Sequence, residues 1–120
     1  METVNPSQEY SYDVMQLLWE EVTQVFPDEF VHVGLDEAYY RCWQSNPNIS
    51  DWMQSMGFEE YNEIEEYYSL RITNITLSLN ASVIAWQDPI DNNVTVLKTP
   101  ADCTNKTKDC RIELYLAARH

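Results

Sequence analysis

Hydrophobic residues recur with helical spacing in three stretches of the chain. Between Tyr10 and Phe26 they are three and four residues apart, which predicts an amphipathic helix that ends at Pro27-Asp28. Asn46-Pro47 opens a shorter helix that Gly57 ends, because asparagine and proline favour helix starts and glycine favours helix ends. A longer helix is predicted from Glu59 to Leu79, with a hydrophobic stripe made of Tyr61, Ile64, Tyr68, Ile72, Ile75 and Leu79.

Two short runs between these helices have the composition of buried strands. Phe30–Leu35 and Ser82–Trp86 are mostly apolar and rich in β-branched residues, which predicts strands that are covered on both faces. Helices connect the two strands, and such a connection favours a parallel pair. The sequence therefore predicts an α/β fold.

Net charge limits the partners of the chain and divides it in two. The 120 residues carry 20 acidic and 7 basic side chains, a net charge of −13. This charge repels phosphate backbones and anionic lipids, which argues against nucleic-acid binding, and no apolar run is long enough for a membrane span. Residues 98–120 hold five of the seven basic side chains and are polar and turn-like, unlike residues 1–97.

Glycosylation sequons of the form N-x-[ST] are in excess. Chance predicts roughly one in a chain of this composition, and five occur, at Asn48, Asn74, Asn80, Asn93 and Asn105. Coincidence is the alternative interpretation, but the excess favours a protein of the secretory pathway with glycans on exposed faces. The N-terminal residues lack the apolar stretch of a signal peptide, so we expect a piece of a longer secreted protein.

The three cysteines leave their pairing open. Cys103 and Cys110 could close a short loop, and Cys42 would then lack a partner within the chain. The sequence has no CxxC motif and no paired histidines, so it predicts no zinc site.

Candidate chemistry lies at the end of the first predicted strand. Asp36 and Glu37 follow it directly, and α/β folds place active sites at the carboxyl ends of parallel strands. Strand alternation would place His32, Gly34 and Asp36 on one face. An Asp-Glu pair by itself is more often two solvated turn residues than a catalytic pair.

Several motifs in order give this pair a context. The chain resembles the catalytic domain of glycoside hydrolase family 20, which contains the lysosomal and secreted β-N-acetylhexosaminidases, in His32-x-Gly34-x-Asp36-Glu37, Cys42-Trp43-x-Ser45-Asn46-Pro47, Gly57-Phe58 and Ala85-Trp86-Gln87-Asp88. The resemblance covers roughly residues 3–97 and implies a (β/α)₈ barrel. Such a barrel takes about 250 residues. We therefore expect residues 1–97 to be a fragment of the barrel and residues 98–120 to be a divergent polar tail.

The resemblance also implies a mechanism and its residues. Family members cleave terminal N-acetylhexosamine residues from glycans with retention, and the 2-acetamido oxygen of the substrate is the nucleophile. Asp36 matches the carboxylate that orients the acetamide, and Glu37 matches the general acid, which partial burial and an acidic neighbour keep protonated. His32 matches a residue that supports the carboxylates, and Trp86 matches an aromatic wall of the sugar site. No cofactor is implied.

Departures from the family pattern leave alternatives open. The family has glycine at the position of Leu35 and an upstream partner for the cysteine that matches Cys42. The first hypothesis is a fragment of an enzyme that acts in the lysosome or outside the cell. The alternative is a catalytically inactive, truncated family member that pairs with a full-length subunit. An acidic, calcium-binding secreted module is a third hypothesis, disfavoured because the sequence has no calcium-loop motif.

Overall fold

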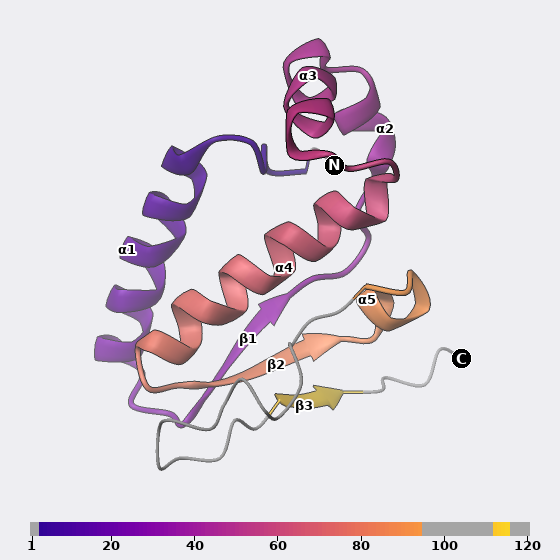
Figure 1. The fold of residues 1–120 in the computed structure, drawn as a ribbon. Coiled ribbons are helices and arrows are strands. Elements are labelled where there is room, and N and C mark those ends of the chain that lie inside the picture. Colours follow the sequence, from indigo (N-terminus) through magenta and orange to yellow (C-terminus); the bar gives the residue numbers. More distant parts are fainter. Residues whose placement is uncertain (1–2, 95–111, 116–120) are drawn as a thin grey trace.

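Helices alternate with parallel strands in the computed structural model, which describes residues 3–94 and 112–115. In chain order the elements are α1 (Glu9–Val25), β1 (Phe30–Gly34), α2 (Tyr40–Gln44), α3 (Pro47–Met56), α4 (Tyr61–Ser78), β2 (Ser82–Trp86), α5 (Asp88–Asp91) and β3 (Ile112–Tyr115). Figure 1 shows α4 lying between α1 and the strands. The α/β prediction is confirmed, and the described strands form an open sheet rather than a closed barrel.

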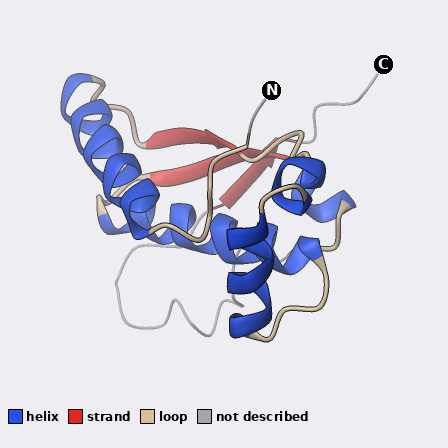
Figure 2. Ribbon diagram, turned by 90° about the horizontal axis from the view of Figure 1, so that it is seen from above, coloured by secondary structure: helices blue, strands red, loops and turns tan. Residues whose placement is uncertain are grey.

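The strands form one parallel sheet in the order β1-β2-β3 (Figure 2). The predicted pairing of β1 with β2 is confirmed, with His32 opposite Ile84. Strand β3 pairs with β2, with Ile112 opposite Val83. The sequence pattern missed β3, whose four residues lie inside the segment interpreted as a polar tail.

One face of the sheet is buried and the other is open in the described part of the chain. Val31, Val83 and Ala85 are at most 6 % exposed, and α4 packs along β1 and β2. On the opposite face His32 is exposed and Trp86 is 36 % exposed. The expectation of strands covered on both faces is therefore wrong for the described residues, because their one long covering helix lies on one side.

Local signals set the helix ends within two residues of the predicted positions. The side chain of Asn46 accepts a hydrogen bond from the backbone N–H of Asn48 at 3.0 Å, and Pro47 occupies the first turn of α3. Gly57 ends α3 with a φ of 74°, a left-handed conformation that glycine adopts without steric cost. A hydrophobic core then joins α2 and α3 to the start of α4, formed by Trp43, Ile49, Met53 and Ile64.

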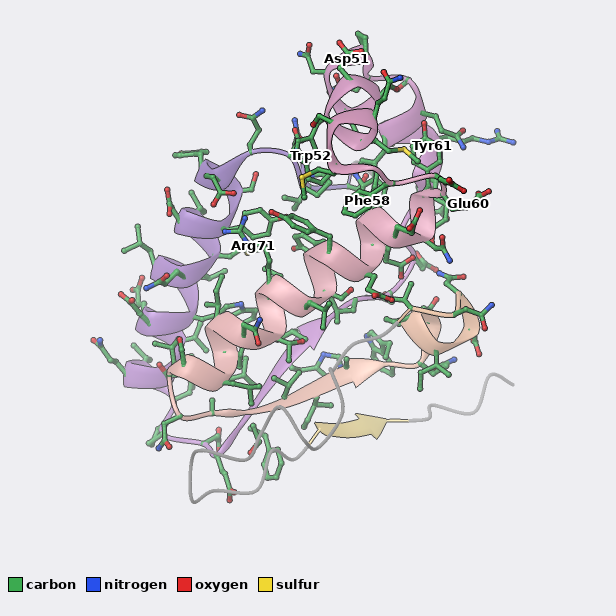
Figure 3. All side chains as sticks on the ribbon, viewed as in Figure 1. Asp51, Trp52, Phe58, Glu60, Tyr61 and Arg71 are labelled. Carbon is green, nitrogen blue, oxygen red and sulfur yellow. The ribbon has the colours of Figure 1, made fainter. Side chains whose placement is uncertain are left out.

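Helix α1 packs on α4 through an arginine. The Arg71 guanidinium lies 3.6 Å from the centroid of the Tyr12 ring and binds both carboxylate oxygens of Glu9, at 2.5 and 2.7 Å. Figure 3 shows Arg71 between the two helices. Tyr12 is buried, whereas Leu18 and Phe26 are 46 % and 61 % exposed although the spacing placed them on the buried stripe. In the described residues α4 alone packs extensively on α1, and it covers only one side of that helix.

Candidate active site

Asp36 and Glu37 lie just beyond the end of β1, where the chain turns sharply. The backbone has positive φ at Gly34 (77°), Leu35 (67°) and Glu37 (51°). Strand pairing ends at Gly34, after a register shift that follows His32. Strand alternation was expected to place Asp36 on the same face as His32. This expectation is wrong, because the extended conformation ends before Asp36.

Gly34 and His32 shape the turn that carries Asp36. A β-carbon at Gly34 would lie 3.5 Å from Asp36 Oδ1, so the carboxylate folds back over the glycine. The backbone N–H of Gly34 donates a hydrogen bond of 3.1 Å to His32 Nδ1. That bond makes Nδ1 an acceptor, so the proton of a neutral His32 ring is on Nε2.

The end of β2 brings a second set of side chains to the same edge of the sheet. The rings of His32 and Trp86 are in contact, with centroids 5.0 Å apart and planes inclined by 58°. The backbone N–H of Glu37 lies 3.5 Å from Asp88 Oδ1, at the start of α5. Four residues named in the sequence analysis therefore lie at one edge of the sheet: His32, Asp36, Glu37 and Trp86.

Both carboxylates are exposed in the described part of the chain. The partial burial expected of Glu37 is therefore not met there. On the helix side of the turn lies a cavity of about 200 Å³, bordered by Asp36 and Glu37, by Leu35, and by Glu65 and Ser69 of α4. Leu35, where the family pattern has glycine, borders this cavity.

Glu65 is a site residue that the sequence pattern missed. It is 3 % exposed and accepts hydrogen bonds from the Tyr40 hydroxyl and from Asn92 Nδ2, the latter at 3.2 Å. Burial raises the pKa of its carboxyl, and the negative charge of Asp88 adds to this, whereas the hydrogen bonds from Tyr40 and Asn92 oppose it. The predicted stripe of α4 centred on Ile64, Tyr68 and Ile72, but the buried face also includes four polar side chains, those of Glu65, Ser69, Thr73 and Thr76. Their four- and three-residue spacing is the signal that could have found them.

Other predicted sites divide between described and undescribed residues. The sequon asparagines Asn48, Asn74, Asn80 and Asn93 are all exposed, as glycan attachment requires. Asn105, Cys103 and Cys110 lie outside the described residues. Within residues 3–94 and 112–115 no group of three His, Cys, Asp or Glu side chains could hold a metal ion, and no helix there is long and apolar enough to cross a membrane.

A family model matches nearly the whole chain. The model described as "Glycosyl hydrolase family 20, catalytic domain" matches residues 1–113. The chain is 39 % identical to the beta-hexosaminidase subunit alpha of Mus musculus over 93 residues, which are 78 % of this chain and 18 % of that protein. It is 40 % identical to the beta-hexosaminidase subunit beta of Rattus norvegicus over 92 residues, 76 % of this chain and 17 % of that protein. The chain thus spans less than a fifth of these curated relatives.

Solved structures resemble the fold. A GH20 exo-β-N-acetylglucosaminidase from Vibrio harveyi, in complex with N-acetylglucosamine, superposes with a TM-score of 0.66 and 24 % identity, over 72 % of this chain and 14 % of that chain. A chitobiase from Flavobacterium johnsoniae gives a TM-score of 0.68 and 22 % identity, over 78 % of this chain and 14 % of that chain. At these identities the likeness shows the fold alone.

Proposed function

Because the chain belongs to glycosyl hydrolase family 20, we propose that it is part of the catalytic domain of a β-N-acetylhexosaminidase-type glycosidase. The proposed reaction removes terminal, non-reducing N-acetylhexosamine residues from glycans by the substrate-assisted, retaining route. The observation that carries the proposal is the position of Asp36 and Glu37, which follow β1 after one intervening residue. The parallel neighbour of β1 ends in Trp86.

The proposed roles follow from what this reaction needs. The 2-acetamido oxygen attacks the anomeric carbon and the acetamide becomes positively charged, so a carboxylate must orient it and balance the charge. We assign this role to Asp36, whose carboxylate lies close to the Gly34 backbone. We assign proton donation to the leaving oxygen to Glu37, its neighbour in the same turn.

The aromatic pair beside the carboxylates supports a sugar site. Trp86 is partly exposed and contacts the ring of His32, so it presents an apolar surface at the edge that carries the two acids. Aromatic faces pack well against apolar groups such as the methyl of an acetamide. Under this proposal Trp86 contacts the substrate, and the His32 ring supports the Trp86 ring by packing against it.

Glycosylation and cellular location are proposed with the activity. Four described sequon asparagines are exposed, which fits attachment of glycans in the secretory pathway. We propose that the protein is a glycoprotein located in the lysosome or the extracellular space. The expected glycosylation and the similarity to beta-hexosaminidase subunits support this location. Pairing with a full-length family subunit is proposed as the assembly to examine.

Turnover of paired substrates tests the proposed function. The protein that carries this sequence, expressed at its natural length, should hydrolyse 4-nitrophenyl N-acetyl-β-glucosaminide but not 4-nitrophenyl β-glucoside, which lacks the acetamido nucleophile. Glu21→Gln on the exposed face of α1 is a control for loss of a carboxylate and should leave turnover unchanged. A folded protein that cleaves neither substrate would favour the inactive family member instead.

A further inference from the structure

A buried carboxylate outside the reacting pair contacts both segments that follow the site-bearing strands. Tyr40 is the first residue of α2, which follows the turn of Asp36 and Glu37, and its hydroxyl donates to Glu65 Oε2. Asn92 follows α5, which begins two residues after Trp86, and its Nδ2 lies 3.2 Å from Glu65 Oε2 and 3.5 Å from Oε1.

We propose that Glu65 is a positioning residue that fixes the segment after β1 relative to the segment after β2. The first segment carries Asp36 and Glu37, and the second begins at Trp86. This inference rests on the proposed function, because it is the proposed function that makes Asp36 and Glu37 the reacting groups. Glu65 lies outside the proposed reacting pair, because the residue is 3 % exposed and its carboxylate bonds to protein groups.

The chemistry of the group suits this role better than a purely structural one. Burying a carboxylate costs more free energy than burying an apolar side chain, so α4 does not need Glu65 for its packing. An ionised carboxylate only accepts hydrogen bonds, and it can accept several at once from different directions. The Tyr40 hydroxyl and the Asn92 amide are donors on separate segments, and one acceptor group between them holds both.

Further hydrogen bonds connect the same segments around Glu65. The backbone N–H of Glu37 lies 3.5 Å from Asp88 Oδ1, which joins the catalytic turn to the start of α5. The Asn62 amide, one turn before Glu65 on α4, lies 3.5 Å from the carbonyl oxygen of Asn92. These bonds are long, so the shorter contacts of Glu65 are the stronger restraint on both segments.

Amide hydrogen exchange in the protein at its natural length tests the positioning directly. Glu65→Gln keeps the shape but replaces one acceptor oxygen by a donor, so either Tyr40 or Asn92 loses its acceptor. We expect the amides of Glu37 and Asn92 to exchange about tenfold faster, because a hydrogen bond to the buried carboxyl group is lost. Amides of the β1–β2 pairing should stay within about twofold, because that pairing does not depend on Glu65.

A matched control separates this effect from loss of any carboxylate. Asp51→Asn removes an exposed charge on α3, and Figure 3 shows Asp51 on the side of that helix away from α4. It should leave exchange at Glu37 and Asn92 unchanged. Uniformly faster exchange in the Glu65→Gln variant, in β1 and β2 as well, would reduce Glu65 to a general structural role and overturn the proposal. Unchanged exchange at Glu37 and Asn92 would overturn it as well.

Turnover by the protein at its natural length tests the consequence for the reaction. Glu65→Gln should lower kcat about tenfold and leave KM within about twofold, because the acids are misplaced while the sugar contacts remain. Adding Tyr40→Phe to this variant should lower kcat by less than Tyr40→Phe does alone, since both changes act on the contacts of one carboxyl group. Loosened segments with unchanged kcat would overturn the role in the reaction. If the unsubstituted protein cleaves no substrate, the proposed function fails, and hydrogen exchange still decides whether Glu65 fixes the segments.

Discussion

Two substitutions of Leu35 test the conformation of the turn that carries the two acids. The test compares the free energies of unfolding of the two variants. Its φ of 67° is in the left-handed region, which side chains with a β-carbon disfavour. Leu35→Ala shortens the side chain and keeps the β-carbon, whereas Leu35→Gly removes it. Both variants lose the half-buried leucine, so the difference between them isolates the backbone conformation.

The magnitude follows from two opposing terms. A left-handed conformation costs a residue with a β-carbon about 1–2 kcal/mol, which glycine avoids. Glycine also makes the unfolded chain more flexible than alanine does, and this lowers the stability of the folded state by about 0.4–1 kcal/mol. The Leu35→Gly variant should therefore be more stable to unfolding than the Leu35→Ala variant by about 0.8 kcal/mol, the difference between the midpoints of these two terms.

Urea unfolding of the chain, followed by far-ultraviolet circular dichroism, measures this difference. Ala38 supplies the control in the same segment, because its φ is not positive. There Ala38→Gly should destabilise the chain by about 0.5–1 kcal/mol, the usual cost of glycine. A Leu35→Ala variant more stable than the Leu35→Gly variant would refute the left-handed turn and the account of the site built on it.

Four further substitutions test the acids and the α1–α4 contact. In the protein at its natural length, Glu37→Gln should abolish cleavage of substrates with poor leaving groups and reduce that of activated aryl glycosides less; equal losses would remove Glu37 from the acid role. Asp36→Asn should raise the barrier by about 3 kcal/mol, measured as kcat for N-acetylglucosaminides; an equal loss on substrates without the acetamide would contradict its role. Arg71→Met should destabilise the chain by about 1–2 kcal/mol in urea unfolding, because the contact with the Tyr12 face is lost. Glu9→Gln should cost less, because the Glu9 side chain is 73 % exposed, and a larger loss would assign the contact to the ion pair.

Elements with strong local signals were predictable from the sequence. The spacing of apolar residues gave α1 and α4, and Asn46-Pro47 and Gly57 gave the limits of α3, because capping and turn conformations depend on nearby residues. The parallel pairing of β1 and β2 followed from the helices between them. The short helices α2 and α5 and strand β3 were missed, since four or five residues carry too little periodicity to be recognised.

The position of the candidate site residues at the sheet edge was predictable, but the backbone geometry around them was not. The order of strand and acids placed Asp36 and Glu37 at the sheet edge, whereas the backbone turn at Gly34 and Leu35 depends on contacts made later along the chain. The buried Glu65 was missed for the same reason. Its partners Tyr40 and Asn92 lie 25 residues before and 27 residues after it, and no local pattern relates such distant positions.

Backbone strain in the described residues is concentrated beside Asp36. Leu35, Glu37, Asn80 and Asn93 are the non-glycine residues there with positive φ. Asparagine tolerates this conformation at turns, so the costly cases are Leu35 and Glu37, on either side of Asp36. Such strain persists only where surrounding contacts hold it. Leu35 borders the cavity next to α4, and the Glu37 amide faces Asp88, in the segment that Asn92 anchors to Glu65. Loss of the Glu65 contacts should therefore relax this turn before it loosens the sheet.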